Sequence, residues 1–334
     1  MLSVLSLRPR TSAGAILCFH SVATPEIPSR SDVHVSLGKF KSLIAAARGI
    51  GQLVPLRDLV RRHFAGRSTA GLISITADDA YASLLGETAD FLRREAIPLT
   101  VFVVAQAAAL GAAFWWDRVD DLFPHVSTSR WRAFEDAAGL PPEYRNRHLA
   151  PYGPLRPLRQ WILSAFTGRW PSELDRLLRE LEQETGTRTA HRSMTFEELD
   201  SLAALPSVDL GVHTVSHPVL PLLPDAELHR EIAGSYDALR ERYANIVPIL
   251  AMPFGLLDDR SVRAARDAGM TASLTLAATT LKQQCDGNDL PRFCMSQSET
   301  ALKLQLHLAG VFERFRRWRG GAVSRYPALP SPMT

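Results

Sequence analysis

Short apolar runs rich in Val, Ile and Leu recur along this chain, and each is followed by a polar or Gly/Pro-containing loop and then a helix-like segment. Hydrophobicity within each run is continuous rather than alternating, as parallel strands buried on both faces require. The pattern therefore predicts strands at residues 15–20, 72–76, 99–104, 208–212, 247–252, 271–276 and 290–295.

Helix-like segments separate several of these runs, most clearly at residues 84–95, 225–243 and 259–268. The repeated order of strand then helix is typical of the α/β class, and seven such strands favour a barrel over an open sheet. A length of 334 residues suits a single barrel that carries an insertion. We therefore expect residues 1–334 to form one domain, a (β/α) barrel of about seven parallel strands.

One region interrupts this order, because residues 112–191 contain several helical patterns and no clear strand. We interpret this region as a helical insertion. Five of the six tryptophans of the chain lie in it. Aromatic rings can stack on sugars, but within a helical insertion they more often fill a small core. Trp115 and Trp116 are the two that we expect to contact a ligand.

The two ends of the chain bear on its location. From about residue 300 the sequence predicts a basic amphipathic helix and then a Pro-rich tail. Such a helix usually packs its apolar side on its own protein, although it can also lie on an anionic membrane surface. At the amino end Arg8 and Pro9 interrupt a short apolar stretch, so we find no signal peptide, and no transmembrane segment of about 20 apolar residues follows. We expect a cytoplasmic protein, with peripheral membrane contact through the C-terminal helix as the alternative.

Composition argues against several classes of protein. Hydrophobic residues make up 46% and charged residues 22% of the chain, which is ordinary for a globular protein. The formal charge of +3 is too small to indicate a nucleic-acid partner. Cys18, Cys285 and Cys294 form no CxxC pair and are odd in number, so neither a disulfide framework nor a thiolate zinc knot is indicated. We expect Cys18 and Cys294 to be small buried hydrophobes within strands.

Two adjacent carboxylates, Asp78 and Asp79, follow the second apolar run. In a barrel this position is the carboxyl end of a strand, where active sites lie. Like charges so close raise each other's pKa, and a bound cation is the simple remedy. Adjacent side chains point different ways, so one carboxylate can bind a metal while the other faces substrate as a base. The alternative is that the pair caps a following helix.

Two histidines four residues apart, His213 and His217, follow the fourth run and precede Pro218. Neutral imidazoles at this spacing can bind one divalent ion from a helical turn or a tight loop. Together with one carboxylate they leave coordination positions for water and substrate, as catalysis requires. HxxxH alone is a weak signal. The alternative is that His213 caps the strand and that His217 makes a surface hydrogen bond.

A Pro-Phe-Gly turn, residues 253–255, ends the fifth run. Such a turn fixes the chain and can aim a backbone N–H at a developing oxyanion. Without the Asp pair and the two histidines, it would be interpreted as an ordinary connection between a strand and a helix.

Taken in this order, the three segments resemble the polysaccharide deacetylase family with NodB homology, also classed as family-four carbohydrate esterases. The family's TFDDG motif is similar to residues 76–80, TADDA, and its H-(S/T)-x-x-H-P motif is matched in full by residues 213–218, HTVSHP. Its PYG turn is similar to residues 253–255, PFG. The flanking segments resemble members that act in exopolysaccharide pathways. The resemblance covers roughly residues 14–110 and 190–296.

The resemblance implies a distorted barrel in which Asp79, His213 and His217 bind a divalent metal ion, with zinc expected and cobalt or nickel as alternatives. It also implies that Asp78 is the general base and that the backbone N–H of Phe254 helps to hold the oxyanion. The implied reaction removes an N-acetyl, or less often an O-acetyl, group from an acetylated glycan or a lipid-linked sugar. Cell-surface or exopolysaccharide metabolism is its expected setting.

The chain departs from the family pattern at several positions. Ala77 and Ala80 replace the usual Phe and Gly, which should alter packing and turn shape without removing either carboxylate. Met252 stands where many members have a nearby arginine that orients the base. Arg292, in the last run, could take that part from across the barrel mouth.

We find no secure match for the histidine that serves as general acid in the family. His20, at the end of the first run, is our candidate for an acid or substrate-binding role, with a buried structural histidine as the alternative. His307 fits an LxxH string, but it lies in the predicted C-terminal helix and we interpret the match as coincidence.

The sequence therefore predicts a hydrolase of carbon–nitrogen bonds whose substrate site includes Trp115, Trp116, Pro253 and Gly255. Two alternatives stay open. The altered Asp-Asp context and the missing acid are compatible with a catalytically silent carbohydrate-binding or scaffold protein. A metal hydrolase of a non-sugar amide is the other, because related barrels handle such amides.

Overall fold

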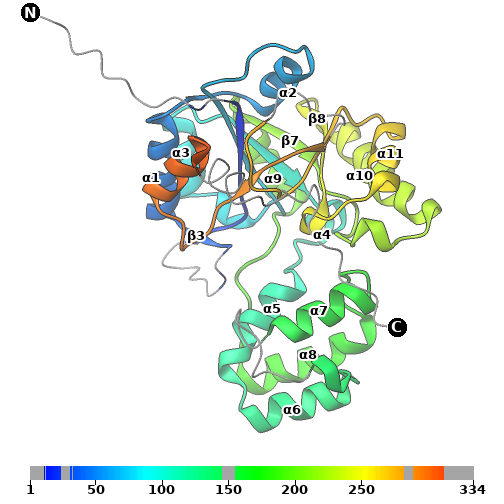
Figure 1. Ribbon diagram of the computed structural model, residues 1–334. Helices are drawn as coiled ribbons and strands as arrows, with labels where there is room; N and C mark the ends of the chain where they lie inside the picture. The colour runs from blue at the N-terminus through cyan, green and yellow to red at the C-terminus, as the bar shows by residue number, and fades with distance from the viewer. Residues whose placement is uncertain are drawn as a thin grey trace, which may run out of the picture.

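The computed structural model of this chain describes residues 11, 13–23, 31, 33–144, 155–281 and 289–311. Its main body is a curved parallel sheet with helices around it, and a second group of helices lies at one end (Figure 1).

All hydrogen-bonded strand pairs of the main sheet are parallel within the described residues. Eight strands follow the order β10-β9-β8-β7-β6-β5-β1-β11, and β4 pairs with β5 outside that path. Their bounds are β1 Ala15–Phe19, β4 Gln52–Leu53, β5 Leu72–Ala77, β6 Leu99–Val103, β7 Val208–Val212, β8 Ile246–Ala251, β9 Ala272–Leu274, β10 Asp289–Leu290 and β11 Phe293–Cys294. Two short strands, β2 Val22–Ala23 and β3 Val35–Ser36, form a separate parallel pair.

One short segment, residues 289–294, joins the two edges of the main sheet. Its first part, β10, pairs with β9, and its second part, β11, pairs with β1. Pro291 and Arg292 lie between the two parts, and a proline interrupts a strand because it has no N–H to donate to the ladder. The sheet closes on itself through this break, so the last predicted strand is split in two. The predicted fold, a distorted barrel of parallel strands, is confirmed.

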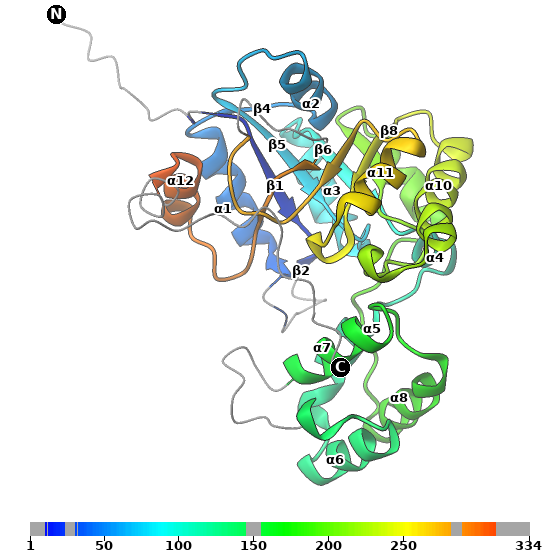
Figure 2. The ribbon, with the colours of Figure 1, turned by 45° about the vertical axis from the view of Figure 1, so that its right-hand side comes forward.

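Helices cover the outside of the barrel, and α2 lies at the end opposite the second helical group (Figure 2). The bounds of these helices are α1 Leu37–Arg48, α2 Leu56–Phe64, α3 Glu87–Arg94, α4 Ala105–Leu110, α9 Phe196–Ala203, α10 Asp225–Arg242, α11 Asp259–Asp267 and α12 Ala301–Leu308. The predicted helix at 84–95 begins later, because Gly86 adopts a left-handed φ of 58° just before α3.

The hydrophobic pattern alone did not predict α1 and α2. The sequence does contain a helix-start signal for α1, because Ser36 caps this helix by accepting a hydrogen bond from the backbone N–H of Lys39. The apolar positions Phe40, Leu43 and Ile44 then repeat at helical spacing and are buried.

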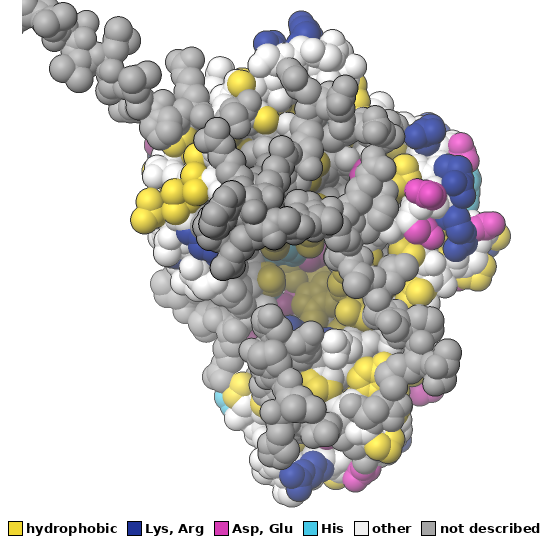
Figure 3. All heavy atoms as spheres, in the orientation of Figure 1, with side chains coloured by type: hydrophobic (Ala, Val, Ile, Leu, Met, Phe, Trp, Pro, Cys, Tyr) yellow, Lys and Arg dark blue, Asp and Glu magenta, His cyan; other side chains and the backbone are white. Residues whose placement is uncertain are grey.

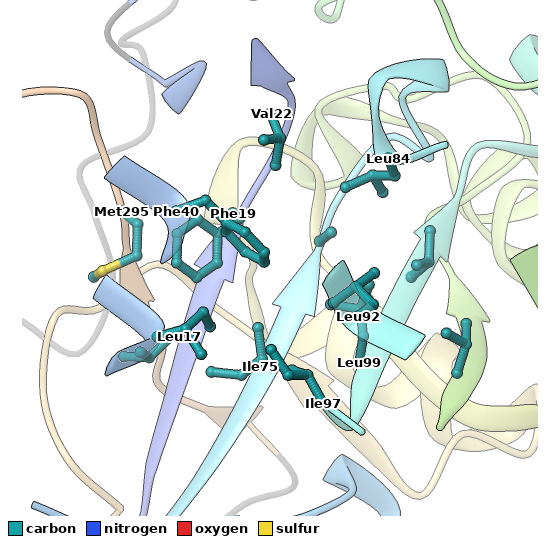
Figure 4. Packing of buried hydrophobic residues seen from close by; sticks show 14 of the residues in the cluster. Leu17, Phe19, Val22, Phe40, Ile75, Leu84, Leu92, Ile97, Leu99 and Met295 are labelled. Carbon is teal, nitrogen blue, oxygen red and sulfur yellow. The ribbon is translucent and has the colours of Figure 1, made fainter. Parts of the chain in front are cut away.

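The largest apolar core lies between the strands and the helices that cover them. Leu17, Ile75 and Leu99 come from three neighbouring strands and pack toward Phe40 and other helical side chains (Figure 4). Each fully buried side chain of this size contributes about 1.5–3 kcal/mol. Ile16, one position along β1, belongs instead to a cluster that includes Phe102. Alternate residues of β1 therefore face the outer helices and the barrel interior.

The second helical group consists of α5 Trp115–Leu122, α6 Thr128–Ala137, α7 Arg156–Ala165 and α8 Ser172–Thr185. These helices surround an apolar core of their own, in which Trp131 and Trp161 are buried. The described residues of 112–191 contain helices and turns but no strand. The group lies below the barrel in Figure 1, at the carboxyl ends of its strands.

The C-terminal part of the described chain packs on the barrel. Leu304 and Leu308 of α12 are buried in the main core beside α1. The rest of the predicted amphipathic tail, residues 312–334, lies outside the described residues. The described part of α12 thus gives the membrane-contact alternative no support. Among the helices that the structure describes, none has both the length and the apolar character needed to span a bilayer.

Candidate active site and metal centre

A cavity of about 310 Å³ lies between the carboxyl ends of the barrel strands and the second helical group. Figure 3 shows a hollow there, lined largely by apolar side chains with charged and histidine side chains at its edge. The cavity wall includes most of the side chains that the sequence analysis assigned to the site, namely His20, Asp78, Asp79, Trp115, Trp116, His213, His217, Phe254 and Gly255. Pro253 and Arg292 are buried beside it.

Three potential ligand side chains from two strand ends converge at the floor of this cavity. One Asp79 oxygen, Oδ1, lies 3.5 Å from Nε2 of His213 and 3.6 Å from Nε2 of His217. One ligand atom of each residue lies within 4.8 Å of the others. All three residues are buried, with at most 6% of their surface exposed. The alternative of a surface hydrogen bond for His217 is therefore wrong.

Backbone contacts orient His213 toward this centre. Its Nδ1 lies 2.8 Å from the carbonyl oxygen of Ala251, and an N–H there donates to that oxygen, which leaves Nε2 directed at Asp79. Burial, opposed by the charge of Asp78, lowers the pKa of His213 to about 4. Burial and the neighbouring His213 also lower the pKa of His217. Both imidazoles are therefore neutral at pH 7, the form that binds a metal.

The loops that carry these side chains contain an unusual density of left-handed backbone. Asp79, Ala80, Thr214, His217 and Phe254 all have φ between 48° and 69° without being glycine. Such conformations cost of order 1–3 kcal/mol each and persist where the surroundings impose them, often at functional sites. The short 3-10 helix that follows the Asp pair, Ala82–Leu84, has Tyr81 at its N-cap position and no side-chain capping bond, and the next α-helix begins at Glu87. The alternative that the pair caps a helix is wrong.

The surroundings of Asp79 indicate whether a cation fits this centre. Its Oδ1 is buried and has no hydrogen-bond partner among the described residues. Burial and the adjacent Asp78 raise the pKa of Asp79 to about 8, against the opposing charge of His20. A divalent cation would remove this conflict by pairing with the carboxylate. One carboxylate oxygen and two neutral imidazole nitrogens form a donor set that suits zinc, cobalt or nickel, so the residues fit such an ion.

Asp78 differs from its neighbour because a buried arginine neutralises it. Arg292 donates to both carboxylate oxygens of Asp78, at 2.7 and 2.8 Å. It also donates to the Thr275 carbonyl oxygen, and it lies 5.5 Å from the centre of the Phe102 ring. Burial alone would raise the pKa of Asp78, but the charge of Arg292 holds it well below its usual range. Asp78 is therefore an ionised carboxylate, and its Oδ2 lies 3.9 Å from Nε2 of His213.

His20 and Cys294 lie on the cavity wall, and Cys18 of the neighbouring strand is fully buried beside them. Burial alone would lower the pKa of His20, but Cys294 and the carboxylates of Asp78 and Asp79 together raise it to about 9. Cys18 donates from Sγ to Oδ2 of Asp78 at 3.4 Å. His307, the other histidine weighed as an acid, lies on α12 beside Phe293 rather than in the cavity wall.

Aromatic rings also line the cavity. Trp116 and Phe254 flank the ring of His217, with centroid distances of 5.0 and 4.6 Å. Trp115 is 8% exposed and donates from Nε1 to the Gly168 carbonyl oxygen at 2.9 Å. It belongs mainly to the core of the second helical group, whereas Trp116 is only partly buried. The two tryptophans thus differ in how much ring they offer to a ligand.

Two supporting networks were not anticipated from the sequence. In the first, Glu231 of α10 accepts hydrogen bonds from the backbone N–H groups of Val215 and Ser216, both at 2.9 Å. Arg169, from the second helical group, pairs with Glu231 at 2.8 Å and also donates to the Ser216 hydroxyl. The loop between the two histidines is therefore held by a carboxylate that is distant in sequence.

The second network joins the helical group to the strand that carries the Asp pair. Tyr81 donates to Oδ2 of the buried Asp117 at 2.6 Å and accepts from Nε1 of Trp116 at 3.1 Å. Nε2 of His34 lies 3.1 Å from Oδ1 of the same carboxylate. The sequence around Tyr81 gives no sign that it joins this network, because its partners come from α5 and from the loop before β3.

The part of the chain that carries the histidines matches a known family. Residues 167–273 match the family model described as polysaccharide deacetylase. Over these residues the match bears out the resemblance predicted from the sequence motifs. A comparison with the curated proteins found no match.

Several solved structures are similar to this fold. The deacetylase PplD of Streptococcus pyogenes, in complex with acetate, aligns over 90% of this chain and 99% of its own, with a TM-score of 0.57 and 12% identity. IcaB from Ammonifex degensii aligns over 90% and 98%, with a TM-score of 0.57 and 15% identity. A de-N-acetylase from Aggregatibacter actinomycetemcomitans aligns over 88% and 99%, with a TM-score of 0.53 and 12% identity. At such identities the likeness supports the fold alone.

Proposed function

We propose that this chain, which carries a polysaccharide deacetylase domain, is a metal-dependent enzyme that removes N-acetyl, or less often O-acetyl, groups from a glycan or a lipid-linked sugar. Its class, a hydrolase acting on carbon–nitrogen bonds other than peptide bonds, follows from that domain. The observation that carries the proposal is the convergence of Asp79, His213 and His217 beside the spare carboxylate of Asp78. A role in cell-surface or exopolysaccharide metabolism belongs to the same proposal.

Asp79, His213 and His217 hold the metal ion, for which zinc is our first expectation and cobalt or nickel the alternatives. When bound, such an ion supplies a Lewis acid for the acetyl carbonyl and lowers the pKa of a water molecule. Neutral imidazoles and an ionised carboxylate are the protonation states that this binding requires.

Asp78 is the general base of the proposed reaction. Arg292 keeps it ionised, so it accepts hydrogen bonds and can take the proton of the attacking water. The carboxylate of Asp78 lies 3.9 Å from Nε2 of His213, and in this proposal it stands beside the metal ligands without being one of them. Arg292 acts as a positioning residue, because it reaches the reaction only through Asp78.

Phe254 and His20 complete the proposed chemistry. The Pro-Phe-Gly turn presents the N–H of Phe254 to the developing oxyanion, and the left-handed φ of 57° at Phe254 sets the direction of that part of the backbone. His20, with a pKa of about 9, is protonated at neutral pH and can donate a proton to the departing amine.

The cavity wall favours a sugar ring as substrate. The ring of Trp116 is partly exposed in the cavity, and we expect a sugar ring to stack on it. Its centroid lies 5.0 Å from that of the His217 ring and 6.0 Å from that of the Phe254 ring. The Trp115 ring packs edge-on against Trp116, with ring centroids 5.5 Å apart. Pro253 and Gly255 shape the turn that carries Phe254. Apolar rings with a few convergent polar groups are the usual make-up of a small-molecule site.

Two substitutions test the proposal. Asp79→Asn should lose bound zinc, cobalt or nickel, measured by metal analysis after dialysis. Asp78→Asn should retain the metal but lose acetate release from acetylated glycans by about 100-fold or more, since a general base contributes about 10²–10⁴. A folded protein with neither metal nor turnover would overturn the assignment. Sugar binding that is unaffected by a chelator, without acetate release, would favour the carbohydrate-binding alternative.

A further inference from the structure

A second cluster of metal-binding side chains lies beside the proposed catalytic centre. Cys18 of β1 and Cys294 of β11 are register partners in neighbouring parallel strands. Side chains of paired residues in a sheet point to the same face, and residues two positions apart on one strand do so as well. Cys18 follows Ile16 on the interior face of the barrel, and His20 follows Cys18 beyond the end of β1. Chain geometry therefore brings two thiols and an imidazole together.

The distances in this cluster suit a tetrahedral soft metal ion. A sulfur atom of each cysteine and a ring nitrogen of His20 all lie within 4.8 Å of one another. Zinc–sulfur bonds of about 2.3 Å at tetrahedral angles place two sulfur atoms about 3.8 Å apart. The imidazole of His20 already contacts Cys294 through a side-chain hydrogen bond, and its Nδ1 is buried without a hydrogen-bond partner among the described residues. No rearrangement of the strands is needed for the three atoms to share one ion.

The cavity gives an ion access to this cluster. Cys294 and His20 line the cavity, so an ion can reach them, and their open side leaves a fourth position for water. Cys18 is fully buried and donates to Asp78, which is itself paired with Arg292. Two thiolates neutralise a divalent cation, and the two thiol protons leave to solvent on binding.

We propose that Cys18, His20 and Cys294 form a second metal site that takes a soft divalent ion such as Zn²⁺ or Cd²⁺. Its sulfur-rich donor set distinguishes it from the Asp-His-His centre, which has only nitrogen and oxygen donors. Filling this site engages His20. If the proposed function holds, excess metal therefore inhibits deacetylation by removing the acid.

Cadmium titration of chelator-treated protein tests the second site directly. The wild-type protein should bind two equivalents, one of which produces a thiolate-to-cadmium charge-transfer band in the ultraviolet. Cys294→Ser should lose that band together with one equivalent. Cys285→Ser, which changes the third cysteine of the chain, should behave as the wild type. Absence of the band in the wild-type protein, or its persistence in Cys294→Ser, would overturn the proposal.

Asp79→Asn separates this proposal from the proposed function. It should keep the charge-transfer band and lose the other equivalent. If the band appears but no second equivalent is found in any variant, the soft site stands and the catalytic metal centre fails. In an active preparation, excess zinc should inhibit the wild-type protein and lose that effect in Cys294→Ser. Equal inhibition of both would show that His20 is not engaged by the second ion.

Discussion

Arg292 donates hydrogen bonds to both carboxylate oxygens of Asp78, at 2.7 and 2.8 Å, although 214 positions separate the two residues in the chain. Both side chains are almost fully buried. The pair connects the segment between β10 and β11, where the sheet closes, with the end of β5 across the barrel interior. The closure of the sheet therefore positions the arginine that keeps the proposed base ionised.

Removing this arginine should shift the pH dependence of the enzyme. Arg292→Met leaves Asp78 buried without the charge of the arginine, so the pKa of Asp78 rises and the acidic limb of the rate of acetate release moves to higher pH. We expect a loss of about 3–5 kcal/mol in the free energy of unfolding. Arg292→Lys, the matched control, keeps the charge but not the two-pronged geometry, and should show a smaller shift of the limb. Unchanged pH–rate profiles would contradict the role of Arg292.

The same pair has a consequence for stability. The folded-state pKa of Asp78 lies below the unfolded value of about 3.9, so its ionisation stabilises the fold fully above about pH 4. That contribution is lost as the pH falls through the folded-state pKa. Unfolding free energies measured from about pH 4 downward should therefore fall less steeply in Arg292→Met than in the wild type.

The carboxylate of Glu231 should control metal affinity without touching the metal. Glu231→Gln exchanges one acceptor oxygen for an NH₂ group. That group either faces the N–H groups of Val215 and Ser216 or faces the Arg169 guanidinium and the Ser216 hydroxyl, so one set of bonds to the loop is lost in either orientation. We expect metal binding to weaken by roughly 10–100-fold, measured by competition with a chelator. Glu227→Gln is the matched control, because Glu227 also pairs with Arg169 but makes none of these loop contacts. Equal metal affinities in the two variants would count against the positioning role.

Gly168 should matter for activity because of what lies against it. A Cβ added at Gly168 would meet the Phe254 ring at 2.8 Å, and the φ of 81° strains any other residue. Gly186 has a similar φ of 67° with nothing within 4 Å. Alanine at either position should destabilise the protein by about 1–2 kcal/mol. Only Gly168→Ala should also slow acetate release, because it displaces Phe254, and comparable rates in the two variants would contradict this reasoning.

Trp116 should contribute to substrate binding more than to stability. Trp116→Ala removes a ring worth about 0.5–1.5 kcal/mol in stacking, roughly a 3- to 10-fold rise in KM. Trp116→Phe keeps a ring but loses the N–H donated to Tyr81, so its KM should stay near that of the wild type. Trp131 is 1% exposed in the core of the second helical group, and Trp131→Ala should instead cost about 3–5 kcal/mol in unfolding free energy. A fall in kcat without a change in KM for Trp116→Ala would argue against a stacking role.

Parts of the fold were predictable because the relevant signals are local. Continuous apolar runs identified the long parallel strands, and β7 was predicted with its observed bounds, Val208–Val212. The short strands β9, β10 and β11 were less well delimited, since a few paired residues carry too little pattern to define an end. The break at Pro291 divided a run, residues 290–295, that was predicted as one strand.

The sequence by itself determined which chemical groups stand at the strand ends, because a parallel barrel brings the carboxyl ends of its strands to one mouth whatever the intervening loops do. Asp78, Asp79, His213 and His217 could be singled out on that ground. Only the tertiary structure decided that Arg292 holds Asp78, that Glu231 holds the histidine loop and that Cys18 faces Cys294. These contacts depend on strand register and on how the barrel closes, which are set by the packing of the whole sheet rather than by any local pattern.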